Sequence, residues 1–148
     1  MSSLIENKKA NFNYEILETM EAGIELLGHE VKSIRKREGS LEGARVIVRG
    51  NEAFLVGATI PPYQPANTEK DYEPERNRKL LLNKKEIMII LGAESKKGLT
   101  IIPISVYNKG RKIKVSVAIV RGKKKYDKRD SIKKRETDRD IRRTLKNE

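Results

Sequence analysis

The sequence has no cysteine and no tryptophan, and its 148 residues include one histidine, His29. Without cysteine the chain can form neither a disulfide nor a thiolate metal site. With one imidazole, a metal site would need carboxylates alone, and no group of Asp and Glu has the spacing of metal ligands. No run approaches the roughly 18 consecutive apolar residues of a membrane span, and the first residues lack an apolar run of signal-peptide length. These absences predict a cytoplasmic protein with no cofactor, no metal and no membrane partner.

Sequence motifs of catalysis are also missing. The glycines follow neither the Walker spacing nor the dinucleotide-binding fingerprint. The only histidine available to activate Ser33, Ser40 or Ser95 is His29, and no motif for nucleophilic attack surrounds these serines. His29 itself follows Gly28 where a strand is expected to lead into a helix, a place that favours a structural role. We therefore expect neither an enzyme nor a small-molecule substrate.

What the sequence does have is positive charge. Lys and Arg number 33 against 21 Asp and Glu, a formal net charge of +12. Such an excess favours a polyanionic partner, either nucleic acid or an acidic membrane surface. The charge is concentrated at the C-terminal end, where residues 121–148 hold 13 basic and 6 acidic side chains. We predict a body over residues 1–120 and a basic tail over residues 121–148.

The body contains the alternation of a β protein. Ile113, Val115, Val117 and Ile119 alternate with polar or small residues, which is typical of a half-buried strand. A hairpin is expected through residues 108–110 to a preceding strand over 100–107. Four further strands are expected: 45–49 and 52–57 around the turn pair Gly50-Asn51, and a first hairpin of strands 14–18 and 22–27 turning at 19–21.

Two helices and a loop are expected between the six strands. Residues 30–37 have helical spacing and end before Gly39. Asn83 and Glu86 form a capping box at the start of a second helix, which is expected to end at Gly92. Residues 61–74 hold four of the five prolines and predict a loop. The pattern predicts a mainly β fold with inserted helices, an antiparallel barrel of the oligonucleotide-binding type.

The tail has too few apolar residues to fold alone, because the large apolar side chains from residue 121 onward are only Tyr126, Ile132, Ile141 and Leu145. We expect it to be disordered in the free protein. In a helix, five cations would form one narrow stripe: Lys128, Arg135, Arg139, Arg142 and Lys146. The stripe favours a segment that becomes helical on RNA over a tail that only adds solubility.

Three blocks resemble one known family. They are EAGIELLGHEVKSIR (residues 21–35), ERNRKLLLNKKEI (residues 75–87) and GKKKYDKR (residues 122–129). Their order and spacing are similar to those of small protein B, the tmRNA-binding protein of bacterial trans-translation. The resemblance implies an oligonucleotide-binding-type barrel that holds the tRNA-like domain of tmRNA on stalled ribosomes. It also implies a tail that enters the empty mRNA channel of the small subunit at the decoding region and becomes helical.

The resemblance carries RNA-binding roles to particular residues. In the body these are Asn7, Glu21 and Leu81. In the tail the functional block is Gly122, Lys123, Lys124, Asp127, Lys128 and Arg129. Residue chemistry leaves a second role open for each body residue: a frayed terminus for Asn7, an exposed turn carboxylate for Glu21, and a core side chain for Leu81.

Tyr126 departs from the family, in which histidine often precedes DKR. A tyrosine ring can still stack on a base, but it does not change charge near neutral pH. Together with the stripe residues Arg135, Arg139 and Arg142, Tyr126 completes the expected RNA-binding set of the tail. Two alternatives remain beside a tmRNA-binding factor: a generic barrel RNA-binding protein of the ribosomal or initiation type, and an enzyme acting on RNA, against which the missing catalytic groups argue.

Overall fold

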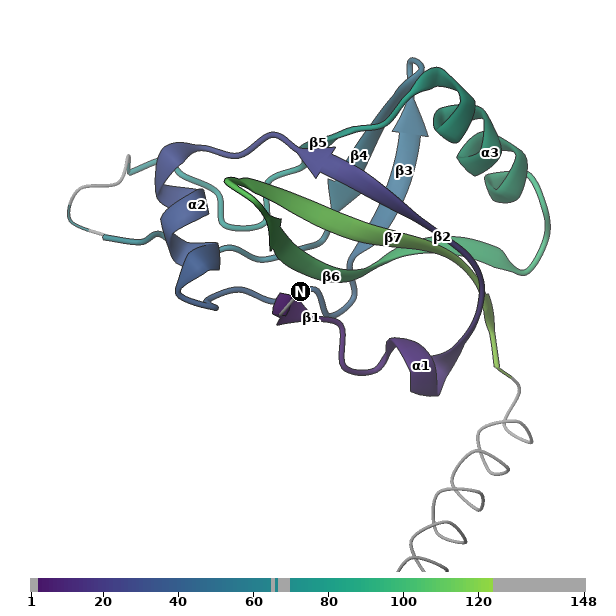
Figure 1. Cartoon of the computed structure of the whole chain (residues 1–148), viewed down its shortest axis with the longest axis horizontal. Helices are drawn as coiled ribbons and strands as arrows, with labels where there is room; N and C mark the ends of the chain where they lie inside the picture. The colour runs from purple at the N-terminus through teal and green to yellow at the C-terminus, as the bar shows by residue number, and fades with distance from the viewer. Residues whose placement is uncertain (1–2, 65, 67–69, 124–148) are drawn as a thin grey trace, which may run out of the picture.

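The computed structural model describes residues 3–64, 66 and 70–123 (Figure 1). These residues form a curled antiparallel sheet of seven strands in the order β1-β6-β7-β2-β5-β4-β3, with three helices. In chain order the elements are β1 (Ser3–Glu6), α1 (Ala10–Asn13), β2 (Tyr14–Ile24), α2 (Gly28–Arg35), β3 (Arg45–Arg49), β4 (Glu52–Val56), β5 (Arg78–Leu81), α3 (Lys84–Glu94), β6 (Leu99–Lys109) and β7 (Lys112–Gly122). The mainly β fold with inserted helices is confirmed.

The expected first hairpin is wrong, because Tyr14–Ile24 is one long strand. β2 pairs with β7 along its length, from Tyr14 opposite Gly122 to Gly23 opposite Lys114. The expected turn at residues 19–21 does not form because each of these residues has a ladder partner on β7. The irregularity in β2 lies instead between Ile16 and Glu18, where the register shifts at a bulge.

The other two expected hairpins are confirmed. Gly50 and Asn51 both have positive φ, 59° and 61°, as a two-residue hairpin turn of type I′ requires. β6 and β7 pair as far as Lys109 opposite Lys112, so the turn is one residue later than expected, at Gly110 and Arg111. β1 and β5, each four residues long, were not expected. Both are short, and β5 lies in a charged stretch whose strand pattern is too brief to recognise.

Both expected helices are present with shifted ends. α2 begins two residues earlier than expected. The capping box of α3 is confirmed: Asn83 accepts from the Glu86 N–H at 2.8 Å, and Glu86 accepts from the Asn83 N–H at 3.0 Å. The expected stop at Gly92 is wrong, because α3 continues to Glu94. Its last turn has tertiary contacts that favour helix there, since Ala93 is buried in the core. The single turn α1 was not expected.

The sheet curls into a partly closed barrel, as expected. β3 comes into contact with β6 without a hydrogen-bonded ladder between them. α3 contacts both strands, and its Glu94 accepts a hydrogen bond from the Val48 N–H of β3 at 3.1 Å. That bond satisfies a donor on an edge strand that has no ladder partner on this side. The interior is filled by aliphatic side chains, including Ile34, Leu55, Leu80, Ile90, Val115 and Val117.

A second, smaller apolar cluster lies under α1. Ala10 packs there against Ile102 of β6 and against Ala118 and Val120 of β7. Residues 61–64 and 70–74 form neither strand nor helix, in agreement with the expected loop. No helix in the described part of the chain is long and apolar enough to cross a membrane.

The last strand extends beyond the expected end of the body. β7 includes Arg121 and Gly122, which pair with Glu15 and Tyr14 of β2. The division between body and tail stays a prediction. The tail residues Lys124, Tyr126, Asp127, Lys128, Arg129, Arg135, Arg139 and Arg142 lie outside the described residues.

Candidate nucleic-acid interface

One row of residues crosses four strands of the barrel. The ladders place Tyr107 of β6 opposite Lys114 of β7, Lys114 opposite Gly23 of β2, and Gly23 opposite Leu81 of β5. Residues directly opposite each other across antiparallel strands lie on the same face of the sheet. We call this row of Tyr107, Lys114, Gly23 and Leu81 the platform. It combines an aromatic ring, an ammonium group, a glycine and an aliphatic side chain.

The position of Leu81 separates its two possible roles. Its neighbour Leu80 is 2% exposed and belongs to the core, whereas Leu81 is 51% exposed. Alternation along β5 therefore directs Leu81 out of the barrel. The structure disfavours the core role for Leu81 and leaves it available to contact a ligand.

Gly23 places no side chain between Leu81 and Lys114 on the platform. A Cβ atom at Gly23 would lie 3.1 Å from the Leu81 Cβ and 3.3 Å from its Cδ1. These separations are tighter than ordinary van der Waals contact, so Leu81 would have to move. Glycine at position 23 therefore allows Leu81 its present position.

Glu21 lies two residues before Gly23, on the same face of β2. Its carboxylate accepts a hydrogen bond from the Tyr107 hydroxyl at 2.5 Å and one from the Lys109 ammonium at 2.9 Å. These two hydrogen bonds hold the pKa of Glu21 below its usual value, and the bond from Tyr107 has the larger effect. Burial and the bond to Glu21 raise the pKa of Tyr107 to about 12. Glu21 is thus a carboxylate beside the platform, held in a strand rather than in a turn.

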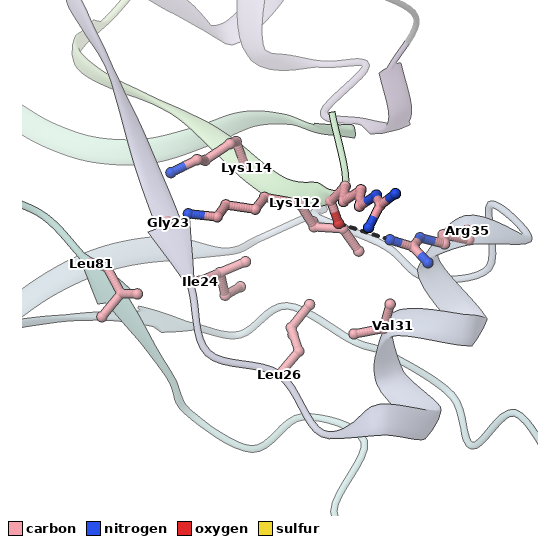
Figure 2. Close-up of a pocket in the computed structure, with 10 residues that line it drawn as sticks. Gly23, Ile24, Leu26, Val31, Arg35, Leu81, Lys112 and Lys114 are labelled. Carbon is pink, nitrogen blue, oxygen red and sulfur yellow. Dashed lines mark hydrogen bonds between the residues drawn. The ribbon is translucent and has the colours of Figure 1, made fainter. Parts of the chain in front are cut away.

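A basic depression of about 310 Å³ adjoins the platform between α2, β5 and the β6–β7 turn (Figure 2). Its lining is half apolar and half cationic and holds no carboxylate. The apolar part, apart from Gly23, is Ile24, Leu26, Val31, Leu81 and Ile113, and the cations are Arg35, Arg111, Lys112 and Lys114. Arg35 is oriented by donating to the Arg111 carbonyl at 3.1 Å. A lining of apolar and cationic side chains suits a ligand that has both phosphates and exposed bases or sugars.

Positive charge continues from this depression along α2. The Lys36 and Lys32 ammonium groups lie 4.8 Å and 5.8 Å from the centre of the Tyr63 ring. At these distances the ring attracts both cations through its negative face. Tyr63 thus helps keep two lysines together on one exposed surface.

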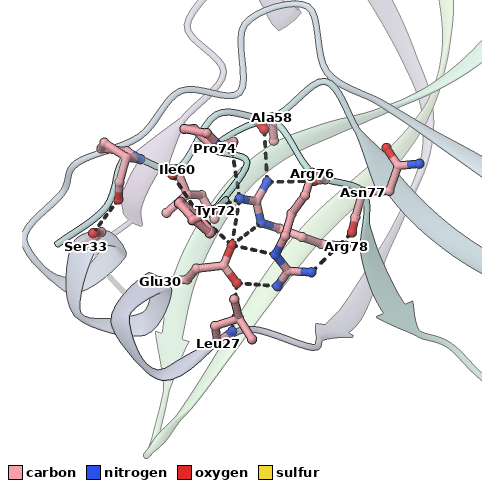
Figure 3. A network of polar contacts seen from close by, with 11 residues as sticks. Leu27, Glu30, Ser33, Ala58, Ile60, Tyr72, Pro74, Arg76, Asn77 and Arg78 are labelled. Atoms are coloured by element: carbon pink, nitrogen blue, oxygen red, sulfur yellow. Dashed lines mark hydrogen bonds and ion pairs between the residues drawn. The ribbon is translucent and has the colours of Figure 1, made fainter. Parts of the chain in front are cut away.

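A buried polar network holds α2 and β5, the elements that flank this depression (Figure 3). Glu30 of α2 and Arg78 of β5 are both 0% exposed. Arg78 donates from Nε to Glu30 at 2.8 Å, and Arg76 donates to both oxygens of the same carboxylate. Burial alone raises the pKa of Glu30, but hydrogen bonds from Arg76, the Leu27 N–H, Arg78 and Tyr72 outweigh it and lower that pKa to about 2.

Arg78 uses all five of its N–H donors in this network. Beyond the Nε bond to Glu30, Nη1 donates to the carbonyls of Ala58 and Arg76, both at 3.0 Å. Nη2 donates to the Pro74 carbonyl at 2.9 Å and to the Tyr72 hydroxyl at 3.1 Å. One saturated guanidinium therefore joins β5 to α2, to Ala58 before the proline-rich loop, and to Tyr72 and Pro74 at the end of that loop.

His29 contributes to the same region by packing. Its ring meets the Tyr72 ring edge-on, with 4.4 Å between centroids. This position agrees with the structural role expected for the single histidine. Among the described residues, no three His, Cys, Asp or Glu side chains gather as the ligands of a metal ion would.

The expected RNA-binding residues Asn7, Gly122 and Lys123 lie away from the platform. The Asn7 side-chain amide donates to the Pro103 carbonyl at 3.0 Å. Gly122 ends β7 opposite Tyr14. Lys123 donates from its ammonium to the Asn11 carbonyl at 2.7 Å and from its N–H to the Asn13 carbonyl at 2.9 Å. The structure therefore brings Glu21 and Leu81 to one surface and places Asn7 beside Pro103 and Ile104 of β6.

Sequence reasoning missed most of the cations of this surface. Lys112 and Lys114 alternate with Ile113 and Val115, and the two lysines were interpreted only as residues on the solvent-facing side of a strand. Their charge was a signal, because consecutive outward positions both carry lysine. Tyr107 and Lys109 gave no comparable signal, since their place beside Glu21 depends on the strand order of the sheet.

The fold and this surface together define a class: a partly closed antiparallel barrel of the oligonucleotide-binding type with a cationic outer strand face. Within that class the chain belongs to the SmpB protein family, whose model matches residues 4–147.

Curated relatives are similar in sequence to this protein over nearly the whole chain. The SsrA-binding protein of Mesoplasma florum is 53% identical over 90% of this chain and 89% of its own length. Those of Elusimicrobium minutum and Microcystis aeruginosa are 52% and 44% identical, over 95% and 97% of this chain and 89% and 93% of theirs. A solved chain described as "tmRNA-SmpB: a journey to the center of the bacterial ribosome" is similar with a TM-score of 0.69. The two chains are 41% identical, and the match covers 82% of this chain and 85% of the solved chain.

Proposed function

We propose that this chain binds the tRNA-like domain of tmRNA and helps deliver it to stalled ribosomes, so that translation is rescued and the nascent peptide is tagged for degradation. It acts in the cytoplasm as an RNA-binding protein and performs no catalytic step. The observation that carries the proposal is the platform with its adjoining basic depression, on a barrel whose named relatives are SsrA-binding proteins.

The platform suits RNA because it offers two kinds of contact. Lys112 and Lys114 are phosphate ligands by type, and phosphate contacts position a nucleic acid without reading its sequence. Leu81, which is half-exposed, offers apolar contact to a base or a sugar. Glu21 is a hydrogen-bond acceptor for base or ribose donors, since a carboxylate does not pair with phosphate.

The tail has a separate role in the proposal. The tail, residues 121–148 in the sequence-based division, enters the empty mRNA channel of the small subunit near the decoding region and forms a helix there. The contacts with ribosomal RNA come from Lys124, Tyr126, Asp127, Lys128, Arg129, Arg135, Arg139 and Arg142. The body, residues 1–120 in the sequence-based division, then holds the tmRNA.

A binding titration tests the platform. The full chain is titrated with the tRNA-like domain of tmRNA and with an unrelated structured RNA of equal length, at several salt concentrations. We expect tighter binding of the tRNA-like domain. Replacing Lys112 and Lys114 with glutamine should reduce the slope of log affinity against log salt by about 1.5, since two phosphate contacts no longer release counterions.

The matched control replaces Lys96 and Lys97 with glutamine, which removes the same charge from an exposed loop beyond α3. The control should bind like the wild type. Equal slopes for the two double variants would remove Lys112 and Lys114 from the phosphate contacts. Equal affinity of the wild type for both RNAs would make the chain a generic barrel RNA-binding protein.

A truncation tests the tail. A chain ending at Lys123 keeps all of β7 and the Lys123 N–H bond to Asn13. We expect it to fold and to keep its tmRNA affinity, but to lose tagging on stalled ribosomes. Tagging at the wild-type rate would refute the proposed role of the tail.

A further inference from the structure

α1 is a single helical turn whose last carbonyls accept hydrogen bonds from Lys123, the residue that follows β7. The Asn13 and Tyr14 N–H groups bond back to the carbonyls of Lys9 and Ala10 and close the turn. The carbonyls of Asn11 and Asn13 instead accept from Lys123, at 2.7 Å from its ammonium and at 2.9 Å from its N–H. A cation is favourable at a helix C-terminus, where carbonyls point outward unpaired. Lys123 thus caps a helix that lies 112 residues earlier in the sequence.

Asn7 holds the start of the same turn. Its N–H donates to the Ile104 carbonyl at 2.8 Å, and its side-chain amide donates to the Pro103 carbonyl at 3.0 Å. Its own carbonyl accepts from the Ala10 N–H at 3.1 Å. The β6–β7 register shifts between Pro103 and Ser105. Asn7 therefore donates hydrogen bonds to two successive carbonyls at this bulge and joins β6 to the first residue of α1.

α1 has little stability of its own, because one turn fixes many dihedral angles for few hydrogen bonds. It is held by three attachments: Asn7 at its start, Ala10 packed on the outer face of β6 and β7, and Lys123 at its end. Figure 1 shows α1 close to the place where β7 ends. The position of the carbonyls that receive Lys123 thus depends on Asn7.

We propose that Asn7, α1 and Lys123 form an exit clamp that fixes the direction in which the chain leaves β7. The inference rests on the proposed function, in which the segment after Lys123 acts on the ribosome while the barrel holds tmRNA. Asn7 and Lys123 are then positioning residues for the tail. Their effect on rescue passes through the clamp rather than through contacts of their own with RNA.

The first test uses the free full-length chain without RNA. Amide hydrogen exchange of Lys123 is followed by NMR in the wild type, Asn7→Ala, Lys123→Met and Lys123→Arg. We expect exchange at position 123 to become at least tenfold faster in Asn7→Ala and Lys123→Met. Lys123→Arg, which keeps a cationic donor, should stay within about threefold of the wild type. The control Arg121→Met removes the same charge from an exposed pair with Glu15 and should exchange at the wild-type rate.

The second test separates tmRNA binding from the step that needs the tail. Asn7→Ala and Lys123→Met should bind the tRNA-like domain within twofold of the wild type, yet tag at least tenfold more slowly on stalled ribosomes. Lys123→Arg should recover most of the tagging. An unchanged melting temperature distinguishes loss of the clamp from a general loss of stability. If Asn7→Ala fails to fold, the test is made with Lys123→Met.

Two outcomes overturn the exit clamp. One is unchanged exchange at position 123 in both Asn7→Ala and Lys123→Met. The other is a tenfold loss of tmRNA affinity in Asn7→Ala while position 123 stays protected, which would make Asn7 a direct RNA contact. Failure of the proposed function is distinguishable, because the wild type itself would then not prefer tmRNA.

Discussion

Replacing Glu30 with glutamine should destabilise the barrel severely. The substitution keeps the shape of the side chain but removes the negative charge that faces Arg76 and the fully buried Arg78. Removing one partner of a buried ion pair typically costs about 3–5 kcal/mol, because the other charge stays buried and unpaired. The pKa of Glu30, lowered from 4.5 to about 2, corresponds to about 3 kcal/mol of stabilisation of the charged form. We therefore expect a loss of about 3 kcal/mol in the free energy of unfolding.

Urea unfolding of the full chain at pH 7, followed by circular dichroism, measures this loss. Glu42→Gln is the matched control, because its ion pair with Lys9 at 3.2 Å is exposed. Exposed pairs contribute about 0–1 kcal/mol. A loss below 1 kcal/mol for Glu30→Gln would show that the reasoning about the buried network is wrong.

A double-mutant cycle then tests whether the two buried charges act as a unit. Arg78→Met alone should also cost several kcal/mol, since it removes one of the buried cations that face Glu30 and the donors that Arg78 supplies to the carbonyls of Ala58 and Pro74. The double variant Glu30→Gln, Arg78→Met should lose about 2 kcal/mol less than the sum of the single losses. Simple additivity would mean that Glu30 and Arg78 do not stabilise each other.

Three further outcomes are expected. The folded-state pKa of Glu30 lies below its unfolded value, so the charged carboxylate stabilises the fold above pH 4.5 and this stabilisation is lost as the pH falls toward 2. The difference in the free energy of unfolding between the wild type and Glu30→Gln, measured by urea titration, should therefore close over that pH range. Gly23→Ala should weaken tmRNA binding about tenfold by displacing Leu81, and unchanged affinity would show that binding does not depend on the position of Leu81. Leu81→Ala should weaken binding similarly while lowering the free energy of unfolding by less than about 1 kcal/mol, because Leu81 is half-exposed; a loss of 2 kcal/mol or more would make it a core residue.

Local signals in the sequence predicted local structure correctly. The turn at Gly50 and Asn51 needs two residues that accept positive φ, and this preference belongs to the residues themselves. The capping box of Asn83 and Glu86 needs only groups three residues apart. Such features are independent of the rest of the fold and can be recognised from a few letters.

Features that depend on distant partners were predicted wrongly or not at all. Residues 19–21 were expected to turn, yet they stay extended because β7 supplies a partner for each. Gly92 was expected to end α3, yet burial of Ala93 and the bond from Val48 to Glu94 favour one more stretch of helix. In both cases tertiary contacts outweigh a weak local preference.

The site divides in the same way. The motif blocks identified Glu21 and Leu81 by their resemblance to a family, but their setting could not be predicted. Tyr107, Lys114, Gly23 and Leu81 meet only because β6, β7, β2 and β5 are neighbours in the sheet. The pairing of Glu30 with Arg78 joins two of the resembling blocks across 48 residues.

The amino-acid sequence by itself determined the charge of this protein, its β-rich composition, its turns and caps, and its membership of a family. These follow from side-chain chemistry and from spacings of a few residues. Only the tertiary structure decided which strands lie side by side, which arginine is buried against Glu30, and which helix receives Lys123. The physical reason is that such contacts depend on the register and order of strands, and these emerge from the packing of the whole barrel.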